Sequence, residues 1–388
     1  MALPSSAAKP QASKQTDYEV FQARGSKERQ RIYAFRYKVL VEELGESLTE
    51  TDYETKTVRG PLDDSAIVLV LGTCAGEIIA TLRLNLNAAQ TLVPTARSLL
   101  MIDRFETFGP ATLSYTSCLA VSSAWRNSPM LSLLVGAAYK LSRAHGVRFD
   151  FVAANPYSLP AFEALGYRRH AATLTDGGSL KCPMVLLLED IRYLKEIGSP
   201  LWRLGITEPN STETALWFMR TFPDVRRIAP SVGMSDDEFW VYLSRRLNRT
   251  PLEGIALLDG LAPEEAKRFV TSGTTIRCKT ADWVLRAGSK SHEMYVVLSG
   301  EVEVCAAGDE TRSVARLGVG EIFGEVGFLS EVRRSAGVVA RSDVEVLMLS
   351  QDYFRRMMVA EPELAAKVLY NLSLLLCGRL AEALGMPR

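Results

Sequence analysis

The C-terminal third of this 388-residue chain alternates short β-rich runs with single glycines. The clearest run covers residues 295–304, lies between Gly288 and Gly320, and contains a glycine of its own at position 300. Runs of β-branched and aromatic residues that stop at glycines are typical of short antiparallel strands joined by tight turns. The pattern therefore predicts a small antiparallel β-barrel in this part of the chain.

A run of Phe-Gly-Glu at 323–325, followed by Arg-Ser-Ala at 334–336, resembles the phosphate-binding cassette of cyclic-nucleotide-binding domains. The order of glycines, hairpin and cassette is that family's own, and the resemblance covers about residues 252–388. It implies a small antiparallel β-barrel of the jelly-roll kind with helices. The ligand-binding residues that it implies are Gly324, Glu325, Arg334, Ser335 and Ala336.

The chemistry of a cyclic phosphate agrees with this resemblance. A buried phosphate needs an arginine and free backbone N–H groups at the start of a helix. The resemblance places Arg334 on the phosphate and Glu325 on the ribose 2′-hydroxyl, while Gly324 lets the backbone approach the sugar. The expected regulator is cAMP or cGMP, and Ser335 favours cAMP, as in the bacterial catabolite activator protein. A barrel that keeps the fold but binds nothing is the alternative.

Composition excludes several classes of protein. The chain has 45 Lys and Arg residues and 45 Asp and Glu residues, so it carries no net positive charge that would attract nucleic acid. The six cysteines are scattered, which predicts a reducing cytosol and no metal site. The N-terminus lacks an apolar signal core, and the most apolar stretch, residues 364–384, reads as an amphipathic helix. We expect a cytoplasmic protein, and not a transcription factor, because no helix-turn-helix follows the barrel.

The hydrophobic pattern predicts an α+β protein with four segments. These are a disordered tail (1–16), a mixed-sheet domain with flanking helices (17–198), a helical connector rich in proline and aromatic residues (199–251), and the barrel domain (252–388). Within the second segment the expected strands are 66–71, 77–85, 112–121, 147–154 and 184–188, and a helix is expected over 129–145.

The second segment resembles the GNAT acyltransferase superfamily. The resemblance starts from a strand, a helix, a strand, and a short helix that ends in Leu-Gly-Tyr at 165–167. Residues 36–45, 61–63 and 76–85 resemble the branch that contains long-chain N-acyl amino acid synthases and acyl-homoserine lactone synthases. The resemblance covers about residues 18–200. It implies transfer of a long-chain fatty acyl group from acyl carrier protein or CoA to an amine, with an amino acid as the expected acceptor.

Acyl transfer in that superfamily uses two splayed parallel strands, which we place at 112–121 and 147–154. A backbone N–H near Leu119 or Val121 is the expected donor to the oxyanion. The start of the 129–145 helix is expected to meet the donor phosphate. Here the chain has Arg126, Asn127 and Ser128 where the superfamily has a glycine-rich loop. This departure favours acyl carrier protein, which presents a single phosphate, over CoA.

Four charged residues match charged positions of the synthase branch: Arg36, Glu43, Asp63 and Arg83. The resemblance implies that Glu43 and Asp63 handle the acceptor ammonium or its proton. A solvent-facing Glu43 and a buried ion pair at Arg83 are the alternatives. The branch's Glu and Arg before the central strand are replaced here by residues 115–118, which argues against lactone synthesis. Cys118 within that stretch is expected to be a core residue.

The sequence thus favours a cyclic-nucleotide-regulated N-acyltransferase. The alternatives are a non-catalytic cyclic-nucleotide-binding regulatory protein and an acyl-homoserine-lactone-type synthase. Acyl carrier protein and a small amine are the expected partners, nucleic acid is not, and peripheral membrane contact would follow from a lipid product. The oligomeric state is left open.

Overall fold

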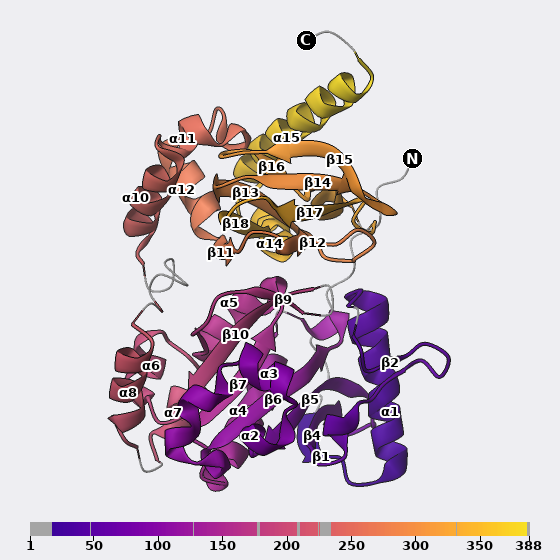
Figure 1. Cartoon of the computed structure of the whole chain (residues 1–388), viewed down its shortest axis with the longest axis vertical. Helices are drawn as coiled ribbons and strands as arrows, with labels where there is room; N and C mark the ends of the chain where they lie inside the picture. The colour runs from indigo at the N-terminus through magenta and orange to yellow at the C-terminus, as the bar shows by residue number, and fades with distance from the viewer. Residues whose placement is uncertain are drawn as a thin grey trace.

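The computed structural model describes residues 18–385, apart from residues 47, 127, 177–178, 208–209, 224, 226–233 and 331. Figure 1 shows two domains stacked along the long axis of the molecule, with the connector running along one side. The predicted tail at 1–16 lies outside the described residues.

The N-terminal domain is built on a mixed eight-stranded sheet in the order β1-β4-β5-β6-β7-β10-β8, with β9 paired to β10. Among the strand pairs of this sheet in the described residues, β6–β7 alone is parallel. The strands are β1 (Tyr18–Gln22), β4 (Ile67–Thr73), β5 (Ile78–Leu86), β6 (Leu113–Val121), β7 (Phe149–Ala154), β8 (Arg168–Arg169), β9 (Leu174–Asp176) and β10 (Ser179–Leu187), and a hairpin is formed by β2 (Thr51–Asp52) and β3 (Thr57–Val58). Each of the five strands predicted from the sequence overlaps one of these.

Helices cover both faces of this sheet. They are α1 (Ser26–Arg36), which continues as a π-helical segment (Tyr37–Glu43), α2 (Ala88–Thr91), α3 (Pro94–Leu99), α4 (Met130–Ala144), α5 (Leu159–Leu165), α6 (Ile191–Glu196) and α7 (Trp202–Gly205). The predicted helix over 129–145 is α4, and its residues Leu134, Val135 and Ala138 are buried at helical spacing. Their side chains pack in one core with Leu71 and Ile79.

The C-terminal domain is an antiparallel β-sandwich, as the glycine-broken pattern predicted. Its two four-stranded sheets have the orders β11-β18-β13-β16 and β12-β17-β14-β15. The strands are β11 (Thr274–Cys278), β12 (Trp283–Leu285), β13 (Glu293–Ser299), β14 (Val302–Ala306), β15 (Asp309–Leu317), β16 (Ile322–Phe323), β17 (Ala336–Ala340) and β18 (Val344–Ser350). The helices are α10 (Asp236–Leu247), α11 (Pro251–Gly254), α12 (Pro263–Thr271), α13 (Glu325–Leu329), α14 (Gln351–Ala360) and α15 (Pro362–Ala383).

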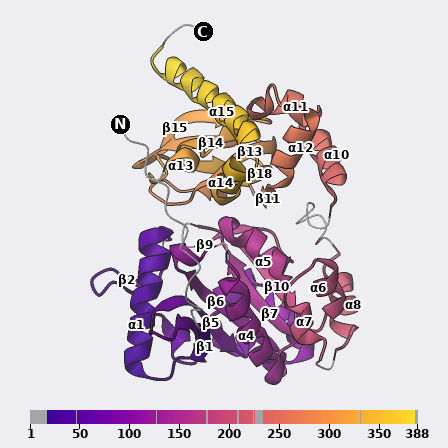
Figure 2. The ribbon, with the colours of Figure 1, turned by 180° about the vertical axis from the view of Figure 1, so that it is seen from behind.

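The last helix, α15, is long and apolar enough to cross a membrane by length and composition alone, with 22% of its most apolar window buried. Its buried residues, among them Leu364, Val368 and Leu372, follow helical spacing. Asn371 donates a hydrogen bond of 3.0 Å to the Leu257 carbonyl. Figure 2 shows α14 and α15 lying against the strands of this domain, so part of α15 packs as an amphipathic helix.

The first part of the connector packs against the N-terminal domain, and the last part packs against the C-terminal domain. In α8 (Glu213–Thr221), Trp217 packs edge-on against Phe105 of the N-terminal domain, and Phe222 stacks on the same ring. In α10, Phe239 and Leu243 are buried in the core of the C-terminal domain. Aromatic side chains of the connector therefore pack against both domains, and residues 226–233 between the two groups lie outside the described residues.

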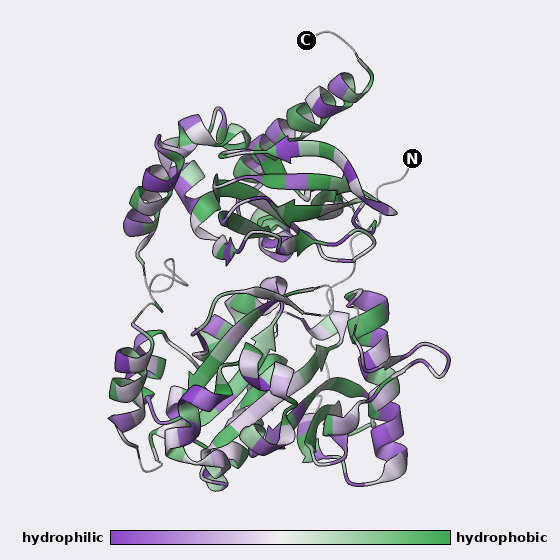
Figure 3. Ribbon diagram, viewed as in Figure 1, coloured by the Kyte–Doolittle hydropathy of each residue, from purple (hydrophilic) through white to green (hydrophobic). Residues whose placement is uncertain are grey.

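The two domains also touch directly. Arg169 Nη1 donates a hydrogen bond of 2.6 Å to the Thr275 carbonyl, and Thr173 donates to the Arg277 carbonyl. Figure 3 shows the strands of both domains mostly in the hydrophobic colour, and buried side chains of β10 share one core with those of β11 and β12. The same core includes Tyr295 of β13, two residues after the start of that strand.

Candidate functional sites

The cassette begins at Gly324, directly before α13. This residue has φ of 82°, a left-handed conformation that glycine adopts without steric cost. A Cβ at position 324 would lie 3.0 Å from Arg334 Nη1, so the glycine also makes room for the guanidinium. The sequence-predicted Gly324, Glu325 and Arg334 are brought together here, Ser335 is exposed, and Ala336 opens β17.

Arg334 is 4% exposed, and its guanidinium is held by protein acceptors. Nε donates to Ser291 Oγ at 2.9 Å, and Nη1 donates to the Gly324 carbonyl at 2.6 Å. Nη2 donates to the Glu293 carbonyl at 2.6 Å and lies 3.5 Å from the Glu293 carboxylate. A buried cation is therefore already positioned where the cassette needs one.

Glu325, the predicted ribose acceptor, is also engaged. Its Oε1 accepts a hydrogen bond of 2.7 Å from Arg379 Nη1, which comes from α15. Arg379, Ser291 and Glu293 were not predicted as members of this site. Their distance from the cassette along the chain left no local signal for them.

A cavity of about 1920 Å³ lies beside the N-terminal sheet and extends to the C-terminal domain. It occupies the fork between β6 and β7, which pair only over Leu113–Tyr115 and Phe149–Phe151 and then diverge. Residues on both diverging arms line it, among them Thr116, Leu119 and Val121 on β6 and Val152 and Ala154 on β7. The predicted pair of splayed parallel strands is thus present.

A β-bulge lies on the diverging part of β6. Thr81 and Arg83 of β5 pair with Ala120 and Ser117, so Cys118 and Leu119 both lie opposite a single residue. Cys118 has φ of 48°, an unusual conformation for a residue other than glycine. Bulges of this kind often adjoin functional sites, where they redirect backbone groups. Burial raises the pKa of the Cys118 thiol, so it remains protonated and is no activated nucleophile.

The carboxylates at the cavity wall each have a partner. Glu43 pairs with Arg126, Glu46 accepts from the Tyr157 hydroxyl, Glu50 pairs with Arg83, and Glu293 pairs with Arg334. Of the sequence-predicted residues, Glu43, Arg83, Leu119, Val121, Arg126 and Ser128 line the cavity. Asn127 lies outside the described residues. Glu46, Glu50 and Tyr157 were not predicted.

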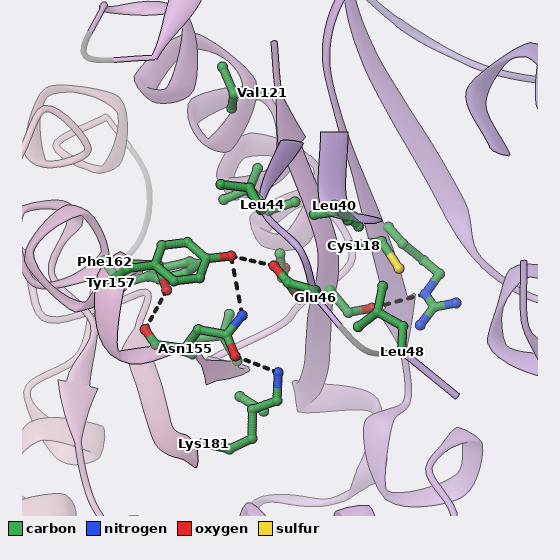
Figure 4. A pocket seen from close by; sticks show the side chains of 18 of the residues that line it. Leu40, Leu44, Glu46, Leu48, Cys118, Val121, Asn155, Tyr157, Phe162 and Lys181 are labelled. Carbon is green, nitrogen blue, oxygen red and sulfur yellow. Dashed lines mark hydrogen bonds between the residues drawn. The ribbon is translucent and has the colours of Figure 1, made fainter. Parts of the chain in front are cut away.

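A chain of hydrogen bonds links four side chains that line the cavity, as Figure 4 shows. Lys181 Nζ donates to Asn155 Oδ1 at 2.6 Å, and Asn155 Nδ2 donates to Tyr157 Oη at 3.2 Å. Tyr157 in turn donates to Glu46. Burial, the charge of Glu46 and its hydrogen bond raise the pKa of Tyr157 well above its usual range. The hydroxyl therefore keeps its proton at neutral pH.

Arg36 and Asp63 lie behind the cavity wall, and both side chains are completely buried. Arg36 Nη1 donates to Asp63 Oδ1 at 2.7 Å, and Asp63 Oδ2 accepts from Arg83 Nη1 at 2.9 Å. Burial alone would raise the pKa of Asp63, but Arg36 and Arg83 together hold it below its usual value. Asp63, which the resemblance assigned to the acceptor amine, does not line the cavity, and neither does Arg36, the other charged position of the branch. Asp63 instead holds Arg83, which does reach the cavity.

In the part of the chain that the structure describes, no cluster of three His, Cys, Asp or Glu side chains could hold a metal ion.

Comparison with known proteins places the cassette in a family. Residues 275–361 match the family model described as "Cyclic nucleotide-binding domain". The chain is 34% identical over 134 residues to the Cyclic AMP receptor protein of Thermus thermophilus, covering 34% of this chain and 60% of that protein. It is 31% identical over 154 residues to a cAMP-dependent protein kinase regulatory subunit of Emericella nidulans, covering 39% of this chain and 34% of that subunit.

One solved structure among the matches is the crystal structure of Thermus thermophilus Catabolite Activator Protein. It is 34% identical over 33% of this chain and 59% of that chain, with a TM-score of 0.30. The chain spans 60% or less of the length of these three relatives. Its C-terminal part therefore contains a cyclic nucleotide-binding domain, while the family match does not include the N-terminal domain. The comparisons support a cyclic-nucleotide-binding regulator more than an acyltransferase.

Proposed function

We propose that this chain is a regulatory protein that responds to a cyclic nucleotide. The observation that carries the proposal is the cassette itself, in which a buried guanidinium and a buried carboxylate flank Gly324. Both groups belong to the segment that matches the family model. In this proposal the cyclic phosphate accepts hydrogen bonds from the N–H groups of Arg334. The ribose 2′-hydroxyl donates a hydrogen bond to Glu325 and replaces Arg379 as the partner of this carboxylate.

The proposed ligand is cAMP, and titration calorimetry on the full chain tests it. We expect cAMP to bind more tightly than cGMP, because Ser335 follows Arg334 and the two relatives above are named for cAMP. Linear 5′-AMP should bind more weakly than either, because a second phosphate charge would have to be buried beside one guanidinium. Tighter binding of cGMP than of cAMP would reverse the assignment of the ligand.

The β6–β7 fork favours a second function, N-acyl transfer. Strand edges that diverge leave backbone N–H and C=O groups free to pair with an extended ligand. A pantetheine arm has amides that suit such an edge. Apolar side chains around the fork provide a surface for a fatty chain, and these are Leu119, Val121, Leu131, Phe162 and Leu165. The large cavity would then hold donor and acceptor together.

The proposed reaction assigns a proton path to the Glu46–Tyr157 pair. The amine nitrogen bonds to the thioester carbonyl carbon, and the resulting oxyanion accepts a hydrogen bond from the bulged backbone near Leu119. The amine proton passes to Glu46, and the carbon–sulfur bond breaks. Tyr157 gives its proton to the leaving thiolate and recovers one from Glu46. Glu43, which the resemblance assigned with Asp63 to the acceptor ammonium or its proton, is engaged with Arg126 in this arrangement.

Replacing Tyr157 with phenylalanine is expected to slow acyl transfer by about 100-fold, the lower end of the usual contribution from general acid–base catalysis. The assay offers C12–C18 acyl groups on acyl carrier protein and on CoA, with amino acids as acceptors. Tyr53→Phe is the matched control, since Tyr53 is largely exposed. Faster turnover of acetyl-CoA than of any long-chain donor would contradict the assignment of a long-chain donor, and an unaffected Tyr157→Phe variant would contradict the role of Tyr157. Absence of transfer from every donor would contradict the acyltransferase proposal.

A further inference from the structure

Glu293 belongs to both candidate sites. It is the first residue of β13, it is 8% exposed, and its carboxylate lies 3.5 Å from Arg334 Nη2. The same residue lines the cavity of the N-terminal domain, together with its neighbours Lys290, Ser291 and His292. One buried carboxylate thus separates the cassette arginine from the cavity.

The guanidinium of Arg334 has five N–H groups, and acceptors of the protein already take four of them. Its Nε is held by Ser291, and its two Nη atoms are held by the Gly324 carbonyl and by Glu293. A cyclic phosphate binds arginine best through two parallel N–H groups, so it must take donors that now point to these acceptors. A second anion next to the Glu293 carboxylate also repels it. Binding of the phosphate therefore weakens the Arg334–Glu293 ion pair.

Two observations link Glu293 to the residues that line the cavity. Burial, Glu46 and also the charge of Glu293 raise the pKa of Tyr157, so the carboxylate lies within electrostatic range of the Glu46–Tyr157 pair. In addition, Lys290 donates to the Glu42 carbonyl. A Cβ at Gly45 would lie 2.5 Å from Lys290 Cβ, so this contact is closely packed. A displacement at the start of β13 must reach the segment that carries Glu43 and Glu46.

We propose that Glu293 couples the cyclic-nucleotide site to the cavity, an inference that rests on the proposed nucleotide binding. The phosphate takes Arg334, and Glu293 loses its buried counter-ion. A ligand with a primary ammonium group in the cavity supplies a replacement cation. Nucleotide and ammonium ligand therefore favour each other, since coupling between two sites is reciprocal. This assigns a cationic amine as the class of ligand whose binding the nucleotide promotes.

The Glu293→Gln variant tests this coupling, because it removes the competing charge and keeps the shape. We expect it to bind cAMP at least about fivefold more tightly than wild type in calorimetry, the lower end of usual coupling factors. Glu303→Gln is the matched control. Glu303 is another buried carboxylate of the same domain, but its partners are Arg341 and Arg316. That variant should bind cAMP with wild-type affinity.

Hydrogen exchange of the wild-type protein gives a measurement that needs no variant. Saturating cAMP should change the exchange of amides in residues 40–46, and Glu293→Gln should abolish the change. Failure of wild type to bind cAMP or cGMP would overturn the regulatory function and the coupling with it. Nucleotide binding without any exchange change in residues 40–46, or with equal affinity in wild type and Glu293→Gln, would overturn the coupling alone.

Discussion

Replacing Arg334 with alanine is expected to weaken cAMP binding by roughly 30- to 4,000-fold, which corresponds to about 2–5 kcal/mol. The size follows from burial. A cyclic phosphate carries one charge into a site where Arg334 is the cation that the cassette supplies, and a buried anion without a partner loses its hydration uncompensated. Calorimetry with cAMP on the full chain measures the effect.

Two controls separate lost recognition from lost structure. Arg333 is the neighbouring exposed arginine and donates to the Gly288 carbonyl, so Arg333→Ala tests charge and surface effects without touching the cassette interior. Its affinity for cAMP should stay within a few-fold of wild type. Arg334→Lys keeps the charge but loses the bidentate geometry, and its affinity should fall between those of wild type and Arg334→Ala. Equal affinities of wild type and Arg334→Ala would refute the assignment of Arg334.

The cassette could be predicted from the sequence because its information is local. Gly324, Glu325 and Arg334 lie within eleven residues, and the backbone at Gly324 requires the left-handed conformation that glycine adopts most readily. The alternation of β-rich runs and glycines likewise predicted an antiparallel C-terminal fold, but it could not give the strand order, because among the described strands of that domain only β14 and β15 pair as neighbours in sequence. The splayed strands β6 and β7 were also located, although Ser114, Thr116 and Ser117 interrupt the first run and Asp150 interrupts the second.

Partners of the predicted residues could not be identified in the same way. Arg379 reaches Glu325 from 54 residues away, and Glu293 reaches Arg334 from 41 residues away. Only the packing of α15 and the start of β13 decides those contacts. In the N-terminal domain, Glu43, Glu46 and Glu50 are all candidates in a run rich in glutamate. The π-helical end of α1 and the loop after it select which glutamate faces which partner, and no residue pattern revealed that irregularity.

Asp63→Ala is expected to destabilise the N-terminal domain by about 3–5 kcal/mol, the usual cost of breaking a buried ion pair. Asp63 is the ion-pair partner of Arg36, and both side chains are completely buried. Arg36 Nε and Nη2 have no hydrogen-bond partner among the described residues, so loss of Asp63 leaves a buried cation almost unsatisfied. Arg83 retains Glu50 and is affected less. Chemical denaturation of the full chain measures the loss as a lower midpoint for the N-terminal domain.

The double variant Arg36→Met/Asp63→Ala shows whether Asp63→Ala loses stability because Arg36 is left as an unpaired buried charge or because packing is lost. Replacing a buried ion pair with apolar residues is often close to neutral, so the double variant should recover much of the stability that Asp63→Ala loses.

Lowering the pH should destabilise the protein in the same way as the Asp63→Ala substitution. The pKa of Asp63 is held below its ordinary value, so its stabilising contribution is present above about pH 4 and is lost as the pH falls through the folded-state value. If Asp63→Ala were as stable as wild type, the network behind the cavity could not hold Arg83 in place, and Arg83 would have to be oriented by Glu50 and Ser117 alone.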